Sequence, residues 1–252
     1  MRSLPTARAL ALCALIVSVL AGCATTFEKG RVDPVRLLNA IVADDAGYVR
    51  DAVNAGAVGV NERIPAPVYM EGTPLITIAA RSASLNVLRY LLSAGADANA
   101  RTPAGETSLM LAAFFGDDGA PSSSRHEAAV RMLVAAGASV ENEFQSYTPL
   151  AYAAYQGRRQ TLRFLLELGA RVNANVENGI TYVSTPLMMA AIMGHTDCAL
   201  ILLSAGADPR VRVVGGHTAR ELAMKHRHAT LARTLACAET LAPGEAFAGR
   251  CH

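Results

Sequence analysis

One short motif, a threonine followed by proline and leucine, recurs along the chain and constrains its fold more than any other feature. The tripeptide TPL begins at residues 73, 148 and 185, and the related TSL and TAR begin at 107 and 218. Thr73 and Thr107 lie 34 residues apart, and Thr185 and Thr218 lie 33 apart. Threonine is a good N-cap, and proline is well tolerated in the first helical turn. This period, with these helix-start signals, indicates stacked repeats of short helices.

A second marker follows each of the first four of these starts. It is an apolar run that ends in Gly-Ala, as in VLRYLLSAGADANA and TLRFLLELGARVNA. In the copy that begins at Thr148, Ala153 and Ala154 are small enough for neighbouring first helices to approach closely. The second helix buries an aliphatic face around Leu162 and Leu165. Each unit alone leaves a hydrophobic side uncovered, so stability requires stacked neighbours.

The copy STPLMMAAIMGHTDCALILLSAGADP (184–209) carries a family resemblance, and on it the chain is identified as a member of the ankyrin repeat family. The resemblance implies an all-α ankyrin-repeat solenoid of about six helix-turn-helix repeats with short β-hairpin fingers. A repeat domain is expected at 34–240, followed by a C-terminal tail at 241–252. The repeats are placed at roughly 32–58, 70–100, 104–140, 145–173, 182–208 and 215–240, the first and last as caps.

The first 22 residues have the character of a signal peptide. Two arginines precede an uncharged apolar run from residue 9 to residue 20. That run is too short to cross a bilayer, which needs about 20 residues, and small residues follow it. A secretory signal at 1–22 is therefore predicted.

The sequence LAGC at 20–23 resembles the lipobox of bacterial lipoproteins. The resemblance implies that Cys23 is lipidated and becomes the first residue of the mature chain, with a tether at 23–33. Because Ala24 follows the cysteine instead of aspartate, it also implies the outer membrane, facing the periplasm. An ordinary signal peptide with an incidental cysteine is the alternative.

Composition excludes several classes of partner. The formal net charge is +2 and the basic residues are scattered, so no footprint for nucleic acid is present. No glycine-rich phosphate loop or dinucleotide fingerprint appears, and no cofactor is expected. Hydrophobic residues reach 52% although aromatic residues are only 5%, which suits small helices in close contact rather than disorder.

The variable positions of the first helices suggest a binding surface. In the ankyrin family these positions line a groove together with the finger tips, and here they are apolar or aromatic, which suits a protein partner. The predicted groove residues are Phe114, Phe115, Tyr152, Tyr155, Met189, Ile192 and Met193. The predicted finger residues are Arg101, Phe144, Tyr147, Glu177, Tyr182 and Arg212. Packing between repeats is the alternative, and it is favoured for Met110 and Met188.

Three insertions break the repeat period, at 57–71, 114–129 and 175–185. The second, FFGDDGAPSSSRHEAA, is expected to form a Gly/Pro/Ser loop between two helices. Insertions in solenoids often lie on the binding face, but drift at tolerant surface positions is an equal alternative here. An extra residue between Leu75 and Ala79 also predicts a distorted helix in the second repeat.

Cysteine and histidine residues offer limited chemistry. Cys237 and Cys251 flank a loose segment that a disulfide could close, although spacing alone does not establish the pairing. Ser122–Ser124 and His126 lie in the predicted loop with no carboxylate placed to orient the histidine, so catalysis is not expected. His226 and His228 are two apart on a predicted helix and would point apart, which disfavours a metal site.

These observations predict a non-catalytic protein-binding module anchored by lipid in a bacterial envelope. The favoured function is that of an immunity or inhibitor protein that neutralises a toxic effector such as a lipase. Lipid-anchored repeat proteins of this type resemble such proteins, and the chain is expected to have a lipid anchor and an apolar groove but no catalytic site. The alternative is a periplasmic scaffold or oxidative-stress accessory protein with an endogenous partner. An enzyme or metal carrier that uses the histidines is a third class.

Overall fold

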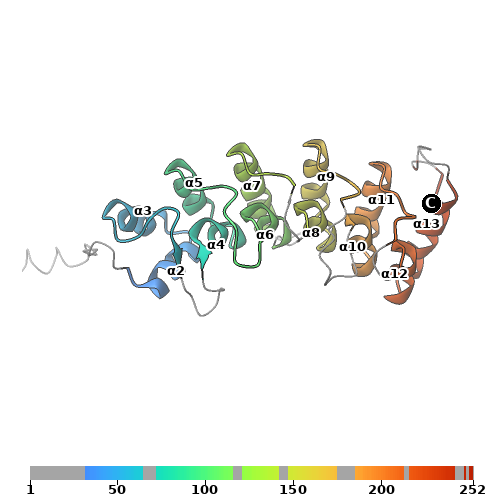
Figure 1. The fold of residues 1–252 in the computed structure, drawn as a ribbon, viewed down its shortest axis with the longest axis horizontal. Coiled ribbons are helices and arrows are strands. Elements are labelled where there is room, and N and C mark those ends of the chain that lie inside the picture. The colour runs from blue at the N-terminus through green and yellow to red at the C-terminus, as the bar shows by residue number, and fades with distance from the viewer. Residues whose placement is uncertain are drawn as a thin grey trace, which may run out of the picture.

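The computed structural model describes residues 32–64, 72–115, 121–141, 147–174, 185–212, 216–241, 247 and 250–251. The predicted signal peptide, Cys23 and most of the tether lie outside the described residues. Within them the chain forms six helix pairs that stack along one axis (Figure 1). The pairs are α2 (Pro34–Val42) with α3 (Ala46–Asn54), α4 (Leu75–Arg81) with α5 (Leu85–Ser93), α6 (Ser108–Phe114) with α7 (Pro121–Ala135), α8 (Pro149–Tyr155) with α9 (Arg159–Glu167), α10 (Pro186–Met193) with α11 (Thr196–Ser204), and α12 (Ala219–Lys225) with α13 (Ala229–Thr240).

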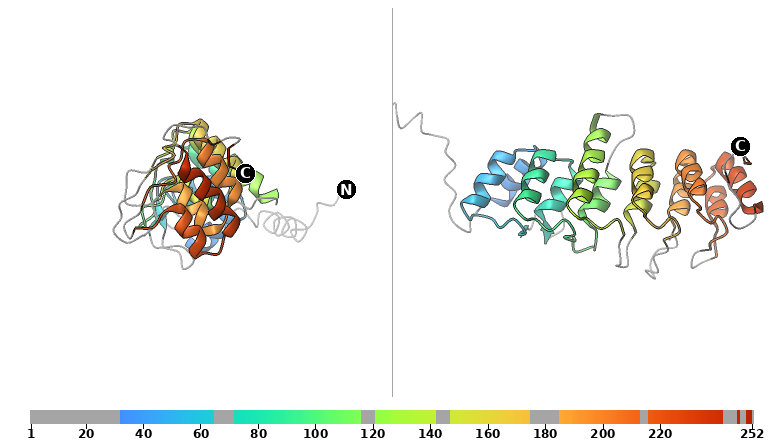
Figure 2. Two further views of the ribbon diagram at one scale, coloured as in Figure 1. Left: turned by 90° about the vertical axis from the view of Figure 1, so that its right-hand side faces the viewer. Right: turned by 90° about the horizontal axis from the view of Figure 1, so that it is seen from above.

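The first helices of the pairs form one row, and the second helices form another (Figures 1 and 2). The N-terminal helices stand at one end of this stack, and α12 and α13 stand at the other. The prediction of an all-α solenoid with six paired helices is confirmed.

Threonine N-caps start four of the first helices. The side-chain oxygens of Thr107, Thr148, Thr185 and Thr218 each accept a hydrogen bond from the backbone N–H three residues later. The second repeat differs, because Pro74 is its N-cap and Thr73 lies in a strand. The extra residue is therefore absorbed before the helix. Helix α4 has the same seven residues as α8, so the predicted distortion is wrong.

The core consists of aliphatic and small side chains between the two rows. Leu150, Ala153, Ala154, Leu162 and Leu165 are all fully buried, as the repeat pattern predicts. Alanine at these contacts lets neighbouring first helices lie close together, which shields the short helices from water. A helix of seven residues would not be stable alone.

A left-handed residue turns the chain from the first helix to the second. Gly157 and Gly194 have φ angles of 73° and 75° at this place. At Gly157 a Cβ atom would lie 2.8 Å from Nδ1 of His195 in the next repeat, so any larger residue would have to displace the His195 ring. His228 lies against Gly194 in the same way, and its Nε2 is 2.9 Å from the carbonyl oxygen of Ile192.

Asparagine side chains link the loops of successive repeats. Nδ2 of Asn61 donates to the carbonyl oxygen of Gly95, and Oδ1 of the same side chain accepts from the backbone of Asp97. Asn99 and Asn173 make the same pair of bonds to the next repeat. These bonds satisfy backbone groups exposed by the turns and fix the spacing between repeats.

The fingers contain little regular structure. Strand β1 (Arg63–Ile64) pairs antiparallel with β2 (Thr73–Pro74), and Arg101 forms an isolated bridge with Thr107. The Nη1 atom of Arg63 donates to the carbonyl oxygen of Arg101 at 2.8 Å, which joins these two fingers.

In its described part, 121–129, the insertion in the third repeat is not the loop that its composition suggests. Residues Pro121–Ala135 form one long helix, α7, so Ser122–Ser124 and His126 are helical and the loop prediction is wrong. Residues 116–120 lie outside the described part. Arg125 anchors the extended end of α7, since its guanidinium donates to Asp44 at 2.8 Å and to the carbonyl oxygen of Ala83.

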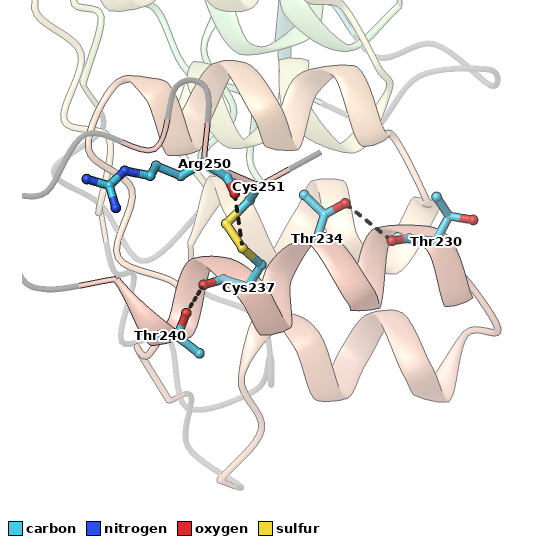
Figure 3. Close-up of a disulfide and its surroundings, with 6 residues drawn as sticks. All are labelled: Thr230, Thr234, Cys237, Thr240, Arg250 and Cys251. Atoms are coloured by element: carbon cyan, nitrogen blue, oxygen red, sulfur yellow. Dashed lines mark hydrogen bonds between the residues drawn. A yellow bond between two sulfur atoms is a disulfide. The ribbon is translucent and has the colours of Figure 1, made fainter.

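The C-terminal end of the solenoid is closed by the tail. Cys237 in α13 forms a disulfide with Cys251 (Figure 3). Cys251 is buried, and Phe247 packs into the same continuous core as the last repeat. The tail thus covers apolar surface that a further repeat would otherwise bury.

Candidate protein-binding groove

An open groove lies along the middle of the first-helix row. Its volume is about 360 Å³, and it runs over α6, α8 and α10. We call it the aromatic groove, and its lining residues are Phe114, Tyr147, Tyr152, Tyr155, Met189 and Ile192. Five of these residues belong to the three helices, whereas Tyr147 precedes α8 and forms a wall.

The aromatic rings contact one another across repeats. Phe114 of α6 stacks nearly parallel on Tyr155 of α8, with ring centroids 6.1 Å apart. Phe114 also meets Tyr152 edge-on at 5.3 Å, and Tyr147 meets Tyr152 edge-on at 6.1 Å. Edge-to-face and offset arrangements are the favourable ones for aromatic pairs. These contacts hold the rings in place while leaving each of them half-buried.

One carboxylate lies behind the rings. The hydroxyl of Tyr152 donates a hydrogen bond to Oε1 of Glu106 at 3.1 Å. Burial raises the pKa of Tyr152 most, and the negative charge of Glu106 raises it further. Glu106 was not among the predicted site residues, because no local sequence pattern pairs it with a tyrosine 46 positions later.

Five of the seven predicted groove residues line the aromatic groove. Met189 is largely buried beneath it, so only part of this side chain is available. Phe115 and Met193 are not among the lining residues. Phe115 lies beneath the guanidinium of Arg81, at 4.1 Å from the guanidinium carbon to the ring centroid, and Met193 is exposed.

The predicted finger residues lie in different parts of the structure, and one of them lines the groove. Tyr147 lines the groove itself. Arg101 bonds within its own finger to the carbonyl oxygen of Gly105, and Arg212 contacts Glu221. Phe144, Glu177 and Tyr182 lie outside the described residues. Met110 and Met188 are buried, in line with the packing alternative.

Two histidines contact the first helix of the preceding repeat. Nε2 of His126 is 2.9 Å from the carbonyl oxygen of Arg81, the same relationship that His228 has with Ile192. His226 and His228 lie in the turn after α12, where Arg227 has a φ of 67°, so the predicted helix at this point is wrong. Among the described residues, no three histidine, cysteine or acidic side chains gather as a metal site would require.

A membrane-spanning helix is also not found in the described ranges, since none of their helices is long and apolar enough.

Comparison with known proteins places the repeats in a family. A model of ankyrin repeats in three copies matches residues 78–176, and a second ankyrin-repeat model matches 150–203. Together these matches cover residues 78–203, which is half of the chain.

Similar curated proteins also carry such repeats. Ankyrin repeat and SOCS box protein 16 of Mus musculus is 40% identical over 133 residues, which is 52% of this chain and 26% of that protein. Palmitoyltransferase Hip14 of Drosophila melanogaster is 40% identical over 90 residues, 35% of this chain and 14% of that protein. The chain therefore corresponds to a minor part of these relatives.

Proposed function

The chain belongs to the ankyrin repeat family, and from this premise we propose that the aromatic groove is the surface by which it binds another protein. Ankyrin repeats are protein-binding modules, and the relatives found are ankyrin proteins. The observation that carries the proposal is the cluster of half-exposed rings from Phe114, Tyr147, Tyr152 and Tyr155. Aromatic residues are enriched at protein interfaces because they bury a large area with few rotatable bonds.

The groove favours binding through its rigidity as well as through its apolar area. Its rings are already ordered by contacts with one another, so binding immobilises few side chains. A preformed surface of this kind loses less entropy on association than a flexible one. We therefore expect the central rings to dominate the affinity, as buried aromatic residues commonly do.

We further propose that the chain is an inhibitor or immunity protein held by lipid in a bacterial envelope, where it neutralises a toxic enzyme. The LAGC sequence at 20–23 supports the anchor. The Cys237–Cys251 disulfide supports an oxidising compartment, because such bonds persist in the periplasm and are rare in the cytosol. An inhibitor needs a binding surface and no catalytic group, which matches a solenoid with a rigid groove.

The experiment uses the product of the neighbouring gene as the candidate toxin. That product is exported to the periplasm of a host with wild-type chain, with a Phe114→Ala/Tyr155→Ala double variant, or with neither. Survival restored by the wild type, and lost with the double variant at equal protein level, is the expected result. A neighbour that is neither toxic nor bound removes the immunity role, and a bound but harmless neighbour favours a scaffold instead.

The anchor has a separate test. Wild-type chain and a Cys23→Ala variant are grown with a fatty-acid analogue, and the label on the purified protein is measured. Label on the wild type alone is expected. Equal label on both proteins would eliminate Cys23 as the lipidated residue without bearing on the groove.

A further inference from the structure

Three half-buried aromatic rings outside the aromatic groove each lie beneath an arginine of the same chain. A cation is attracted to the negative face of an aromatic ring, and the planar, weakly hydrated guanidinium suits this contact well. The pairs are Arg36 with Tyr48, Arg81 with Phe115 and Arg131 with Phe164, at 5.0, 4.1 and 4.2 Å from the guanidinium carbon to the ring centroid. Arginine over a half-buried ring is therefore a recurring contact in this fold.

The rings of the aromatic groove differ from these three. Within the described residues, no guanidinium or ammonium group lies over Phe114, Tyr152 or Tyr155, although all three rings are half-buried. The internal segments outside the described ranges contain no lysine or arginine, so none of them holds a cation that could cover these rings. The groove thus presents to another molecule the kind of surface that the fold elsewhere covers with its own arginines.

A carboxylate adds negative charge beside these rings. Oε1 of Glu106 accepts the hydroxyl of Tyr152 at 3.1 Å, and its Oε2 accepts the hydroxyl of Thr102 at 3.5 Å. No lysine or arginine of the described part forms an ion pair with Glu106, and the guanidinium of Arg101 in the same finger donates to the carbonyl oxygen of Gly105 instead. The charge of Glu106 is therefore carried by hydroxyl groups alone.

The field of this carboxylate acts on the groove. The negative charge of Glu106 helps to raise the pKa of Tyr152, and no positive charge acts on this hydroxyl in the opposite direction. A hydroxyl that donates to a carboxylate is polarised, which leaves more electron density on its ring and strengthens the attraction of the ring for a cation.

We propose that the partner of the aromatic groove inserts an arginine side chain against the rings of Phe114, Tyr152 and Tyr155, where its charge is attracted by Glu106. This inference rests on the proposed function and specifies the chemistry of the partner. Arginine suits the site better than lysine, because a guanidinium gives up its hydration more readily and stacks flat on a ring. An uncharged apolar side chain would gain nothing from the carboxylate.

Four small probes test the inference against the full mature chain. They are the N-acetyl methylamides of arginine, citrulline, lysine and leucine, and citrulline has nearly the shape of arginine without its charge. Nuclear magnetic resonance titration follows the ring signals of Phe114 and Tyr155. The arginine probe should bind most tightly, about two- to fivefold more tightly than citrulline, and this difference should shrink as salt rises.

Two variants separate charge from shape. Glu106→Gln keeps an oxygen that can accept the Tyr152 hydroxyl but removes the charge, so it should weaken the arginine probe about twofold and leave the leucine probe unchanged. The matched control is Glu167→Gln, the same change at an exposed site on α9, which should alter neither affinity. Phe114→Leu keeps apolar surface but removes a ring, so it should weaken the arginine probe more than the leucine probe. Unfolding midpoints identify any change that comes from lost structure.

The outcomes distinguish this inference from the proposed function. Equal affinity for arginine and citrulline, tighter binding of lysine or leucine than of arginine, or the same loss in Glu167→Gln as in Glu106→Gln would overturn the inference. If any of these is found while the toxin test succeeds, the partner chemistry is wrong and the proposed function stands. If the arginine preference is found and the toxin test fails, the groove keeps its preference and the immunity role is removed.

Discussion

The hydroxyl of Tyr152 in α8 donates a hydrogen bond to the carboxylate of Glu106, a residue 46 positions earlier that precedes α6. This bond joins the third repeat to the fourth directly behind the aromatic groove. Tyr152 is therefore both a wall of the groove and part of the contact between repeats. Its neighbour Tyr155 also contacts the third repeat, but through stacking of its ring on Phe114.

The alkaline stability of the protein should depend on Tyr152. Its pKa is raised by burial and by Glu106, so the folded chain keeps this proton at a pH where an unfolded tyrosine, with a pKa of about 10, loses it. The stabilising effect is complete below pH 10 and is lost as pH rises, because the unfolded state then binds fewer protons. Urea unfolding between neutral pH and pH 11 measures this.

A Tyr152→Phe variant isolates the effect. It should be less stable than the wild type by about 1 kcal/mol at neutral pH, since one hydrogen bond is lost. It should also lose stability less steeply above pH 10. Tyr155→Phe keeps the Tyr152–Glu106 bond and should retain the wild-type pH dependence. An identical alkaline slope in Tyr152→Phe and the wild type would contradict the assignment.

Tyr155 and Leu150 lie on the same helix, and substitution by alanine should affect them differently. Leu150 is fully buried, so Leu150→Ala should cost about 2–5 kcal/mol of unfolding free energy. Tyr155 is half-buried at the groove, and Tyr155→Ala should cost clearly less while weakening the binding of a groove partner. Urea unfolding of the two variants gives the comparison. Equal losses would mean that Tyr155 is a core residue.

The repeat pattern predicted the fold well because its rules are local. Threonine caps such as Thr148, small residues such as Ala153 and turn glycines such as Gly157 act within a few positions, and each lies where the pattern placed it. The N-terminal extension of α7 through 121–129 was not predicted, because the Gly/Pro/Ser composition of the insertion favours a loop. Its extended end is anchored by the Arg125–Asp44 contact, which joins residues 81 positions apart.

The groove was predictable in its apolar members and not in the contacts that hold them in place. Phe114, Tyr155 and Ile192 stand out in the sequence because exposed helix positions are usually polar. Tyr147 lines the groove from outside the helices, so its place there depends on how the segment before α8 folds back over the first-helix row. The Tyr152–Glu106 bond likewise crosses two repeats and has no local sequence pattern.

Two turn glycines should respond very differently to alanine. Gly157 and Gly169 have φ angles of 73° and 85°, so alanine is strained at both by about 1–2 kcal/mol. At Gly157 the new Cβ would also lie 2.8 Å from Nδ1 of His195, whereas nothing lies within 4 Å at Gly169. Gly157→Ala should therefore lose about 1–3 kcal/mol more. Chemical denaturation of the pair checks this, and equal losses would show that the His195 ring moves aside freely.

The disulfide should stabilise the C-terminal end of the solenoid. Cys237 and Cys251 are 14 residues apart, and closing a loop of about 15 residues contributes about 3 kcal/mol in the chain-entropy model. A Cys237→Ser/Cys251→Ser variant should therefore unfold its last repeat earlier, because Phe247 is no longer held in the core.

Hydrogen exchange should show lost protection in α12 and α13 and little change in α4 and α5. Reducing agent should destabilise the wild type in the same way but leave the variant unaffected, since Cys198 is buried and forms no disulfide. Uniform loss of protection along all six repeats would instead mean that the stack unfolds as one unit and that the tail does not act locally.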